Sequence, residues 1–265
     1  FEEPYKKSRK VLQDQCSPRD GEDDELYFEA YDDMCKIFAE KTNCSVIRFE
    51  NVEIDYMIVL WIQDHPEDEH MIVSTDSDFY QLMAPNVQQY NGTTDQLVSL
   101  EGFIDAKTGK RVIDKKTKEE KALPDPEFIL FEKCVRGDSA DNVFSAYPGA
   151  RLKGSKNKTG IKEAYEDRNS SGFNYNNFML QRWVDHNGDE QRVRDCFERN
   201  KILIDLTLQP DEIKALVRER IAEQTQTEQM RNVGIHFMKF CAKHNLMRMS
   251  ENPNNYTAML NGPAK

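Results

Sequence analysis

Three pairs of acidic residues at the boundaries of expected helices and strands are the residues of this sequence best suited to chemistry. They are Glu53 with Asp55, Asp76 with Asp78, and Asp138 with Asp141. Mg²⁺ prefers hard oxygen ligands and keeps several waters, so two ions about 3.5–4 Å apart need carboxylates from several chain segments. One such ion lowers the pKa of an attacking water, and the other stabilises the leaving oxygen of an in-line displacement. The six acids therefore fit a two-metal site.

Each pair also has an explanation without a metal. The third pair could serve only as capping or turn residues, because aspartate is common in both positions. The first pair could be first-turn acids that complement a helix dipole. Asp76 and Asp78, however, directly follow the apolar residues 71–73, and sites in α/β proteins lie beyond the carboxyl ends of the strands. This placement makes the second pair the strongest candidates.

The elements that would position these acids can be read from the spacing of apolar residues. In the first half we expect helices over 24–41 and 53–64, strands over 45–49, 70–75 and 87–90, and a hairpin joining 102–104 to 111–113. Strands that alternate with helices favour a parallel sheet with crossover helices. In the second half we expect helices over 128–136, 159–167, 175–185, 189–200, 227–245 and from Pro210–Asp211 onward. We predict an α/β domain over 1–125 and a helical domain over 126–265.

Composition excludes several classes of protein. The 265 residues are 38% hydrophobic and 31% charged, which is typical of a soluble globular protein. The sequence has neither an apolar run of about 20 residues nor a charged-then-apolar leader, so we expect no membrane segment and no secretion. The six cysteines form no CxxC pair, which argues against a zinc ribbon or a disulfide framework. We expect a cytoplasmic monomer, in the host cytoplasm if the protein is viral.

The net charge is -11, but the basic residues are not spread evenly along the chain. A negative protein is a poor ligand for phosphates, which bind mainly Lys and Arg. Basic residues nevertheless gather in three segments: Lys6, Lys7, Arg9 and Lys10; residues 107–121; and Arg151, Lys153, Lys156, Lys158 and Lys162. Carboxylates that hold metal ions, with separate basic patches that grip phosphates, would give this distribution, although solvated charge runs would give it too.

Two segments carry a resemblance to a known family. Residues 74–82, STDSDFYQL, match the pattern S-[ST]-D-x-D-[FW]-x-x-L, and residues 136–143, RGDSADNV, match G-D-x-x-D-N. With them the chain resembles, over nearly its whole length, the 5′-nuclease superfamily of flap endonucleases and the 5′-nuclease domain of bacterial DNA polymerase I. It looks closest to the ribonuclease H group of T-even phages. The resemblance implies a PIN-like parallel sheet flanked by helices, followed by a helical domain with a helix-three-turn-helix-like DNA-binding motif.

The resemblance also implies site residues. As ligands of two Mg²⁺ ions, which Mn²⁺ could replace, it implies Glu53, Asp55, Asp76, Asp78, Asp138 and Asp141. As catalytic residues it implies Asp76, Asp78, Lys6 and Arg9. Residues 53–56 are similar to the family's E-A-D-D, with Tyr56 in place of the second aspartate. A register shifted by one would instead place Val52 on the glutamate and Asp55 on the last aspartate.

Two basic segments resemble the DNA-binding parts of the family. Residues 5–9, YKKSR, are similar to the Y-K-x-x-R of the helical arch through which the 5′ strand passes, so residues 1–23 would be the remnant of an arch. Residues 148–161 replace the usual G-I-G-x-K hairpin with a longer and more basic loop, which leaves the potassium ion of some relatives in question. The residues implied to contact DNA, without reading bases, are Tyr5, Lys6, Arg9, Arg151, Lys153, Lys156 and Lys158. Residues 200–205, NKILID, are also similar to the phage enzymes, where they are structural.

The expected function is a magnesium-dependent 5′–3′ exonuclease and flap endonuclease with ribonuclease H activity, which removes RNA primers and adjacent DNA in phage lagging-strand replication. Its substrates would be branched or flap DNA and RNA–DNA hybrids, and its partners a single-stranded DNA-binding protein and a sliding clamp. The alternative is a noncatalytic remnant that binds branched DNA, because the family has further metal-binding aspartates before the arch, where this chain begins. We therefore expect this polypeptide to bind branched DNA and to cleave it poorly. A P-loop phosphotransferase is set aside, because no G-x-x-x-x-G-K-[ST] occurs.

Overall fold

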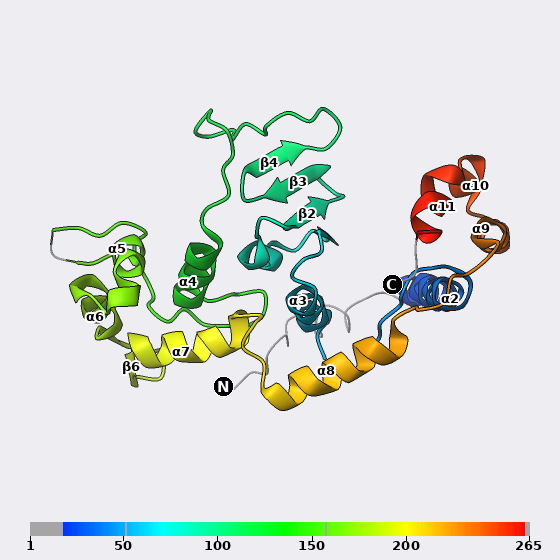
Figure 1. The fold of residues 1–265 in the computed structure, drawn as a ribbon. Coiled ribbons are helices and arrows are strands. Elements are labelled where there is room, and N and C mark those ends of the chain that lie inside the picture. The colour runs from blue at the N-terminus through cyan, green and yellow to red at the C-terminus, as the bar shows by residue number, and fades with distance from the viewer. Residues whose placement is uncertain (1–17, 51, 157, 263–265) are drawn as a thin grey trace. The chain divides into compact units, whose positions relative to one another are not determined.

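The computed structural model describes residues 18–50, 52–156 and 158–262, with side chains from residue 26 onward (Figure 1). The described residues form two compact units, which are treated separately below. The first unit contains residues 58–209, and the second contains residues 18–57 and 210–262. No helix among the described residues is both long and apolar enough to cross a bilayer. The bounds of these units differ from those of the domains expected over 1–125 and 126–265. The division into those two domains stays a prediction.

The first unit contains a four-stranded mixed sheet. Its strands, in spatial order, are β1 (His70–Val73), β2 (Val87–Asn91), β3 (Gln96–Ser99) and β4 (Gly102–Asp105). β1 is parallel to β2, whereas β2 is antiparallel to β3, and β3 is antiparallel to β4. The α/β class with helices beside a sheet is confirmed, but a wholly parallel sheet is not found among the described strands. The connection between β2 and β3 is a tight turn, too short for the crossover that parallel neighbours need.

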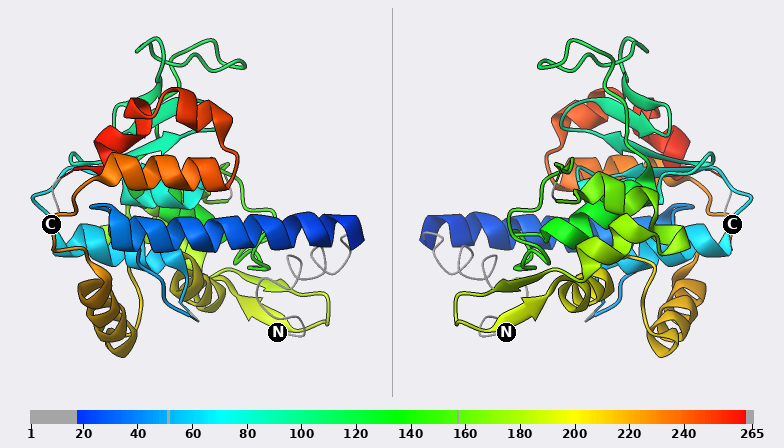
Figure 2. Two further views of the ribbon diagram at one scale, coloured as in Figure 1. Left: turned by 90° about the vertical axis from the view of Figure 1, so that its right-hand side faces the viewer. Right: turned by 90° about the vertical axis from the view of Figure 1, so that its left-hand side faces the viewer.

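Two other parts of the sheet region can be compared with the sequence prediction. The hairpin expected between residues 102–104 and 111–113 is present: Asp105 N donates to Lys110 O at 2.9 Å, and Val112 N to Phe103 O at 2.9 Å. The segment after β4 projects beyond the sheet, at the top of both views (Figure 2). The strand expected over 45–49, in the second unit, is wrong. Side chains take its polar groups instead, since Arg48 N donates to Gln224 Oε1 at 2.6 Å and Ser45 Oγ accepts from Gln226 N at 2.8 Å.

Helices pack beside the sheet in the first unit. They are α4 (Pro126–Arg136), α5 (Ile161–Glu166), η2 (Arg168–Ser170), α6 (Phe173–Met179) and α7 (Val193–Ile204), together with the short strands β5 (Arg182–Val184) and β6 (Glu190–Arg192). Their core includes the fully buried side chains of Val135, Ile161 and Phe178. Burying one such side chain stabilises the fold by about 1.5–3 kcal/mol.

The hairpin of β5 and β6 corrects the helices expected over 175–185 and 189–200. Asp185 Oδ1 accepts from Asn187 N and from Asp189 N, both at 3.0 Å, and Gly188 has a φ of 89°. This turn chemistry stops the helical pattern, because an aspartate that bonds following amides and a glycine with positive φ favour a chain reversal. Two short strands therefore replace the adjacent helix ends.

The second unit is helical. It contains α2 (Pro18–Lys41), α8 (Asp211–Gln224), α9 (Val233–Lys243), α10 (Met247–Glu251) and α11 (Asn254–Leu260), and α3 (Ile54–Asp64) begins in it and continues into the first unit. Met34 and Phe38 of α2 pack against Phe237 and Leu260, as the apolar spacing predicts. Tyr27 and Tyr31, which have the same helical spacing earlier in α2, are instead 63% and 41% exposed. The core of the unit covers only the later part of α2.

Asp33 provides a polar link between α2 and the end of α9, and it predicts a dependence of stability on pH. Its Oδ2 accepts from His244 Nε2 at 2.7 Å and from Lys243 Nζ at 2.9 Å, and these bonds hold the Asp33 pKa below its ordinary value of 3.8. A carboxylate with a lowered folded-state pKa stabilises the fold above its unfolded pKa, and the effect is lost as the pH falls through the folded pKa. We expect Asp33→Asn to lower the thermal midpoint at about pH 6 and to have no effect at about pH 2. The exposed Glu29→Gln is the control, and an Asp33→Asn effect equal at both pH values would contradict the prediction.

Candidate metal centre

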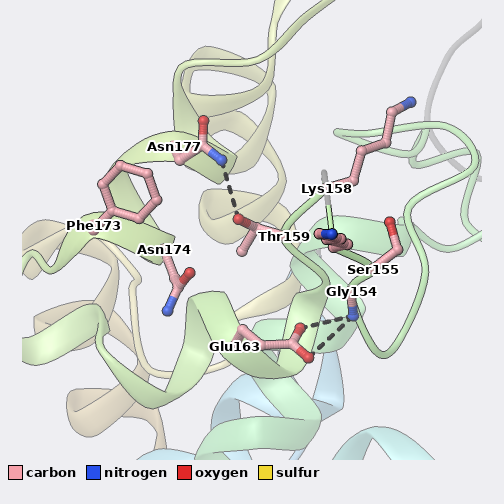
Figure 3. A pocket seen from close by; sticks show the side chains of 9 residues that line it. Gly154, Ser155, Lys158, Thr159, Glu163, Phe173, Asn174 and Asn177 are labelled. Atoms are coloured by element: carbon pink, nitrogen blue, oxygen red, sulfur yellow. Dashed lines mark hydrogen bonds between the residues drawn. The ribbon is translucent and has the colours of Figure 1, made fainter.

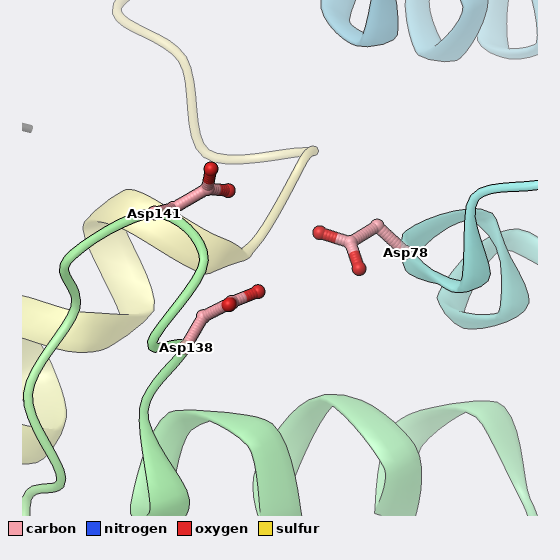
Figure 4. Close-up of side chains that lie close together, drawn as sticks. All are labelled: Asp78, Asp138 and Asp141. Carbon is pink, nitrogen blue, oxygen red and sulfur yellow. The ribbon is translucent and has the colours of Figure 1, made fainter. Parts of the chain in front are cut away.

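Three carboxylates from two segments of the first unit come together. They belong to Asp78 of η1 (Ser77–Leu82) and to Asp138 and Asp141 of the loop after α4, and Figure 4 shows them directed toward a common point. One oxygen of each lies within 4.8 Å of the others, and all three residues are partly buried. Clustered hard oxygen donors of this kind suit a divalent cation such as Mg²⁺ or Mn²⁺. Half of the six predicted ligands therefore form one group.

Asp78 owes its position to the turn that follows β1. Asp76 caps η1, because its carboxylate accepts from Asp78 N at 2.9 Å. Gln89 of β2, which is fully buried, donates from Nε2 to Ser74 O and to Asp76 O, both at 2.8 Å. Asp76 is exposed and is not a member of the group, so its role as a metal ligand stays a prediction. Sequence reasoning missed Gln89, because a glutamine in a short strand gives no sign that it is buried.

The loop 138–143 places the other two carboxylates. Asp138 and Val143 exchange backbone hydrogen bonds of 2.8 and 2.7 Å, and Asp138 Oδ1 accepts from Ala140 N at 2.9 Å. Asn142 adopts the left-handed conformation, with a φ of 58°. Asp138 Oδ1 therefore has the turn role considered from the sequence, whereas the role of Asp138 as a metal ligand stays a prediction.

Gly137 is the residue that lets α4 lead into this loop. Its φ of 75° and ψ of -174° belong to a region that only glycine adopts readily. An added Cβ would also overlap the carbonyl oxygen of Val143. We expect Gly137→Ala to cost at least about 2 kcal/mol of unfolding free energy, as measured in urea, and to weaken Mn²⁺ binding by displacing Asp138. Gly149→Ala is the control, because Gly149 has the same φ with open space around it. Equal losses in the two variants would contradict a role for the overlap.

Lys133 of α4 lies between two members of the group. Its Nζ forms ion pairs with Asp78 Oδ1 and, at 2.9 Å, with Asp138 Oδ2. The three side chains are only 22%, 22% and 19% exposed, so the pairs are largely shielded from water. Sequence reasoning missed Lys133, because a lysine near the end of an amphipathic helix usually marks the solvated face. Its spacing, one helical turn before Gly137, is the signal that could have indicated it.

The three charges shift one another's pKa values. Burial raises the pKa of Asp78, and the hydrogen bond and charge of Lys133 offset this only in part. Burial acts on Asp138 in the same direction, but Lys133 and backbone amides outweigh it, so the pKa of Asp138 is lowered. Burial would lower the pKa of Lys133, yet its two carboxylate partners raise it. Lys133 thus favours the ionised form of both carboxylates.

The other predicted site residues have different outcomes. Glu53 and Asp55 lie at the start of α3 in the second unit, so their predicted role as ligands stays a prediction. Burial, followed by the charges of Glu53 and Asp55, raises the pKa of Tyr56, the residue that departs from the family pattern. The arch residues Tyr5, Lys6 and Arg9 lie outside the described residues.

The basic loop of residues 148–161 is anchored from inside. The Glu163 carboxylate accepts from Gly154 N at 2.9 and 3.1 Å (Figure 3). It also accepts from Gly160 N at 3.0 Å. Burial alone would raise the pKa of Glu163, but these amide bonds outweigh it and lower the pKa. The loop borders a hollow of about 560 Å³ that reaches Phe173 and Asn177. The four predicted DNA-binding side chains here, all exposed, are Arg151, Lys153, Lys156 and Lys158.

Comparison with known proteins gives a fold. No known family profile and no curated protein sequence matches the chain. The T5 D15 protein crystallised with metal ions is 18% identical, with a TM-score of 0.52 over 92% of this chain and 78% of that chain. The T5 5′-exonuclease with bound zinc is also 18% identical, with a TM-score of 0.50 over 91% and 76%. A T5 flap endonuclease in complex with DNA and metal ions has the same identity and a TM-score of 0.50 over 93% and 77%.

The fold is therefore that of the 5′-nucleases, and the resemblance stated from the sequence is confirmed at this level. Within that class the chain is similar to the T5 5′-exonuclease, also described as a flap endonuclease. The closer resemblance to the T-even ribonucleases H stays a prediction.

Proposed function

We propose that the protein is a metal-dependent 5′-nuclease that hydrolyses phosphodiester bonds in branched DNA. The observation that carries the proposal is the convergence of Asp78, Asp138 and Asp141 within 4.8 Å, in a fold shared with the T5 5′-exonuclease. The T5 relatives are crystallised with metal ions and, in one case, with DNA, which supports both the cofactor and the substrate. Magnesium is the proposed physiological ion, and Mn²⁺ a substitute.

The residues have separate tasks in this proposal. A divalent ion held by the three carboxylates would lower the pKa of a water and stabilise the leaving oxygen. Asp76 fixes the η1 turn that presents Asp78. Lys133 pairs with Asp78 and Asp138, so its ammonium would compete with a metal ion for these two carboxylates. Glu53 and Asp55 are proposed as ligands of a second ion, and Lys6 and Arg9 as contacts of the scissile phosphate.

The finer parts of the proposal rest on the sequence resemblance. They are 5′–3′ exonuclease and ribonuclease H activity on flap DNA and RNA–DNA hybrids, a role in phage primer removal in the host cytoplasm, and recruitment of a monomer by a single-stranded DNA-binding protein or a sliding clamp. A substrate panel tests the activity: the full-length gene product is given a 5′ flap, an RNA–DNA hybrid and a linear duplex with Mg²⁺, with Mn²⁺ or with a chelator. We expect cleavage of the first two that depends on metal. Cleavage that persists in the chelator would rule out the metal mechanism.

The alternative is a noncatalytic protein that binds branched DNA. One observation favours it: Lys133 already forms ion pairs with two of the three carboxylates, so its single positive charge offsets part of the group's negative charge without a metal ion. Flap binding without cleavage of any substrate under either metal would support this alternative. Cleavage by the full-length protein would exclude it.

Lys156 and Lys158 give the proposal a quantitative test of DNA binding. Each contact between a lysine and a phosphate releases counterions, so log K changes with log salt concentration by about 0.9 per contact. We expect Lys156→Ala with Lys158→Ala to reduce this slope by about 2 and to weaken binding alike for different base sequences. Fluorescence anisotropy over a range of NaCl concentrations measures the slope, and the exposed Lys239→Ala is the control. An unchanged slope would remove these lysines from the interface.

A further inference from the structure

The end of α7 is hydrogen-bonded to both sides of the acidic loop. Asn200 is fully buried, and its Nδ2 donates to Cys134 O at 2.9 Å and to Phe144 O at 2.7 Å. Cys134 precedes Gly137 on α4, whereas Phe144 directly follows the loop 138–143. One side-chain amide therefore ties together the two stems from which Asp138 and Asp141 project.

The same stretch of chain is bonded to the element that carries Asp78. Gln81 of η1 donates from Nε2 to Ile204 O at 3.2 Å, and its Oε1 accepts from Leu206 N at 3.1 Å. In a 3₁₀ helix, side chains three residues apart lie on the same side, so Asp78 and Gln81 leave η1 in similar directions. Residues 200–206 are thus attached to both halves of the carboxylate group.

We propose that Gln81 and Asn200 are positioning residues of the metal centre, and that residues 200–206 are a brace that sets the separation between Asp78 and the pair Asp138 and Asp141. This proposal rests on the proposed metal-dependent function. It gives a role to the NKILID segment, for which the sequence alone suggested only a structural part.

The brace would hold the three carboxylates of the group in fixed positions. Without a metal ion the carboxylates repel one another, and a productive metal site holds its ligands to within about 0.5 Å. Lys133 offsets charge, but its ammonium is a compact charge on a flexible four-carbon stem and imposes little geometry. The Gln81 amide instead engages a donor and an acceptor of one backbone segment, which fixes both distance and direction.

Gln81→Met is the test variant. It keeps the length of the side chain, removes the hydrogen bonds to Ile204 O and Leu206 N, and replaces no core side chain. Asn200→Leu could prevent folding, since it would leave two buried carbonyl groups without a donor. Asn86→Leu is the matched control. Asn86 Nδ2 also donates to two backbone carbonyls, Pro66 O at 2.9 Å and Asp68 O at 2.8 Å, at the opposite end of β1 from Asp78.

The first readout is Mn²⁺ affinity, measured by electron paramagnetic resonance on the 265-residue chain without nucleic acid. We expect Gln81→Met to raise the Mn²⁺ Kd about tenfold, as loss of an outer partner of a metal site does, and Asn86→Leu to stay within about twofold. Excess Mn²⁺ should restore occupancy in Gln81→Met. The proposal is overturned if the Mn²⁺ Kd of Gln81→Met equals that of the parent. It is also overturned if Asn86→Leu, with the same thermal midpoint as Gln81→Met, loses as much Mn²⁺ affinity.

The second readout needs no metal. Hydrogen exchange of the backbone amides in a chelator should speed up about tenfold at Leu206 and over residues 138–143 in Gln81→Met, but not in Asn86→Leu. Slow exchange in the loop of Gln81→Met overturns the brace. The proposed function fails if the parent chain does not bind Mn²⁺, or if Asp78→Asn binds it as tightly as the parent. In that case the hydrogen-exchange rates alone test the brace.

Discussion

Replacing Asp78 by asparagine is expected to lower metal-dependent cleavage of a 5′ flap by about a thousandfold in the full-length protein. Asparagine keeps the shape of the side chain but removes the charge of a carboxylate that lies close to two others. Metal assistance contributes several kcal/mol to such a displacement, and each 1.36 kcal/mol is a factor of ten in rate. Single-turnover cleavage at saturating protein measures the change.

The same variant should bind flap DNA as tightly as the unchanged protein, because contacts with the DNA backbone are made by basic side chains and amides elsewhere. The exposed Glu67→Gln, in the turn before β1, is the control for loss of one charge. Cleavage within about tenfold of the parent would show that Asp78 is not a ligand that matters for the reaction. Loss of DNA binding together with cleavage would indicate misfolding instead.

Replacing Lys133 by methionine is expected to have opposite effects on stability and on metal binding. Removal of the ammonium leaves Asp78 and Asp138 without their shared partner, in a place where the side chains are about one-fifth exposed. Breaking a fully buried pair from one side costs about 3–5 kcal/mol, so for this partly exposed pair we expect about 2–3 kcal/mol of unfolding free energy in a chelator. A metal ion no longer has to share the site with a positive charge, so the Mn²⁺ Kd should fall about tenfold.

Thermal unfolding in chelator and in Mn²⁺ measures both effects together. The midpoint of Lys133→Met should be lower than that of the parent in chelator, and should rise more when Mn²⁺ is added, since an ion that binds the folded state stabilises it by mass action. Lys115→Met, at an exposed position of the hairpin region, is the control. A variant as stable as the parent in chelator, or one that binds Mn²⁺ more weakly, would contradict the ion-pair geometry.

The parts of the site that were predictable are those encoded by short segments. Asp78 follows an apolar strand within a recognisable motif, and Asp138 and Asp141 share one turn whose glycine and asparagine require positive φ. Local sequence suffices there, because strand ends and tight turns limit where a side chain can point. The same local reasoning failed over residues 45–49, where the Gln224 side chain and the Gln226 backbone amide, both of the second unit, replace a neighbouring strand.

The parts that were not predictable depend on partners far away in the sequence. Gln81 meets Leu206 across 125 residues, and Asn200 meets Cys134 across 66. Nothing in the immediate neighbourhood of these side chains distinguishes them from solvated amides. Lys133 has the same difficulty, since its role depends on a carboxylate of η1 that lies 55 residues earlier. These residues position the site rather than form it, and only the tertiary structure reveals them.

The Glu163 carboxylate fixes the backbone of the basic loop independently of the charged side chains on its surface. Because the Glu163 carboxylate holds the Gly154 and Gly160 amides, the path of the backbone does not depend on the lysines and arginine that project outward. Those side chains can be exchanged during evolution, or by an engineer, without rebuilding the loop. Under the proposed function, the protein would adapt its grip on different nucleic acids by substitutions at its periphery, while the architecture beneath them is retained.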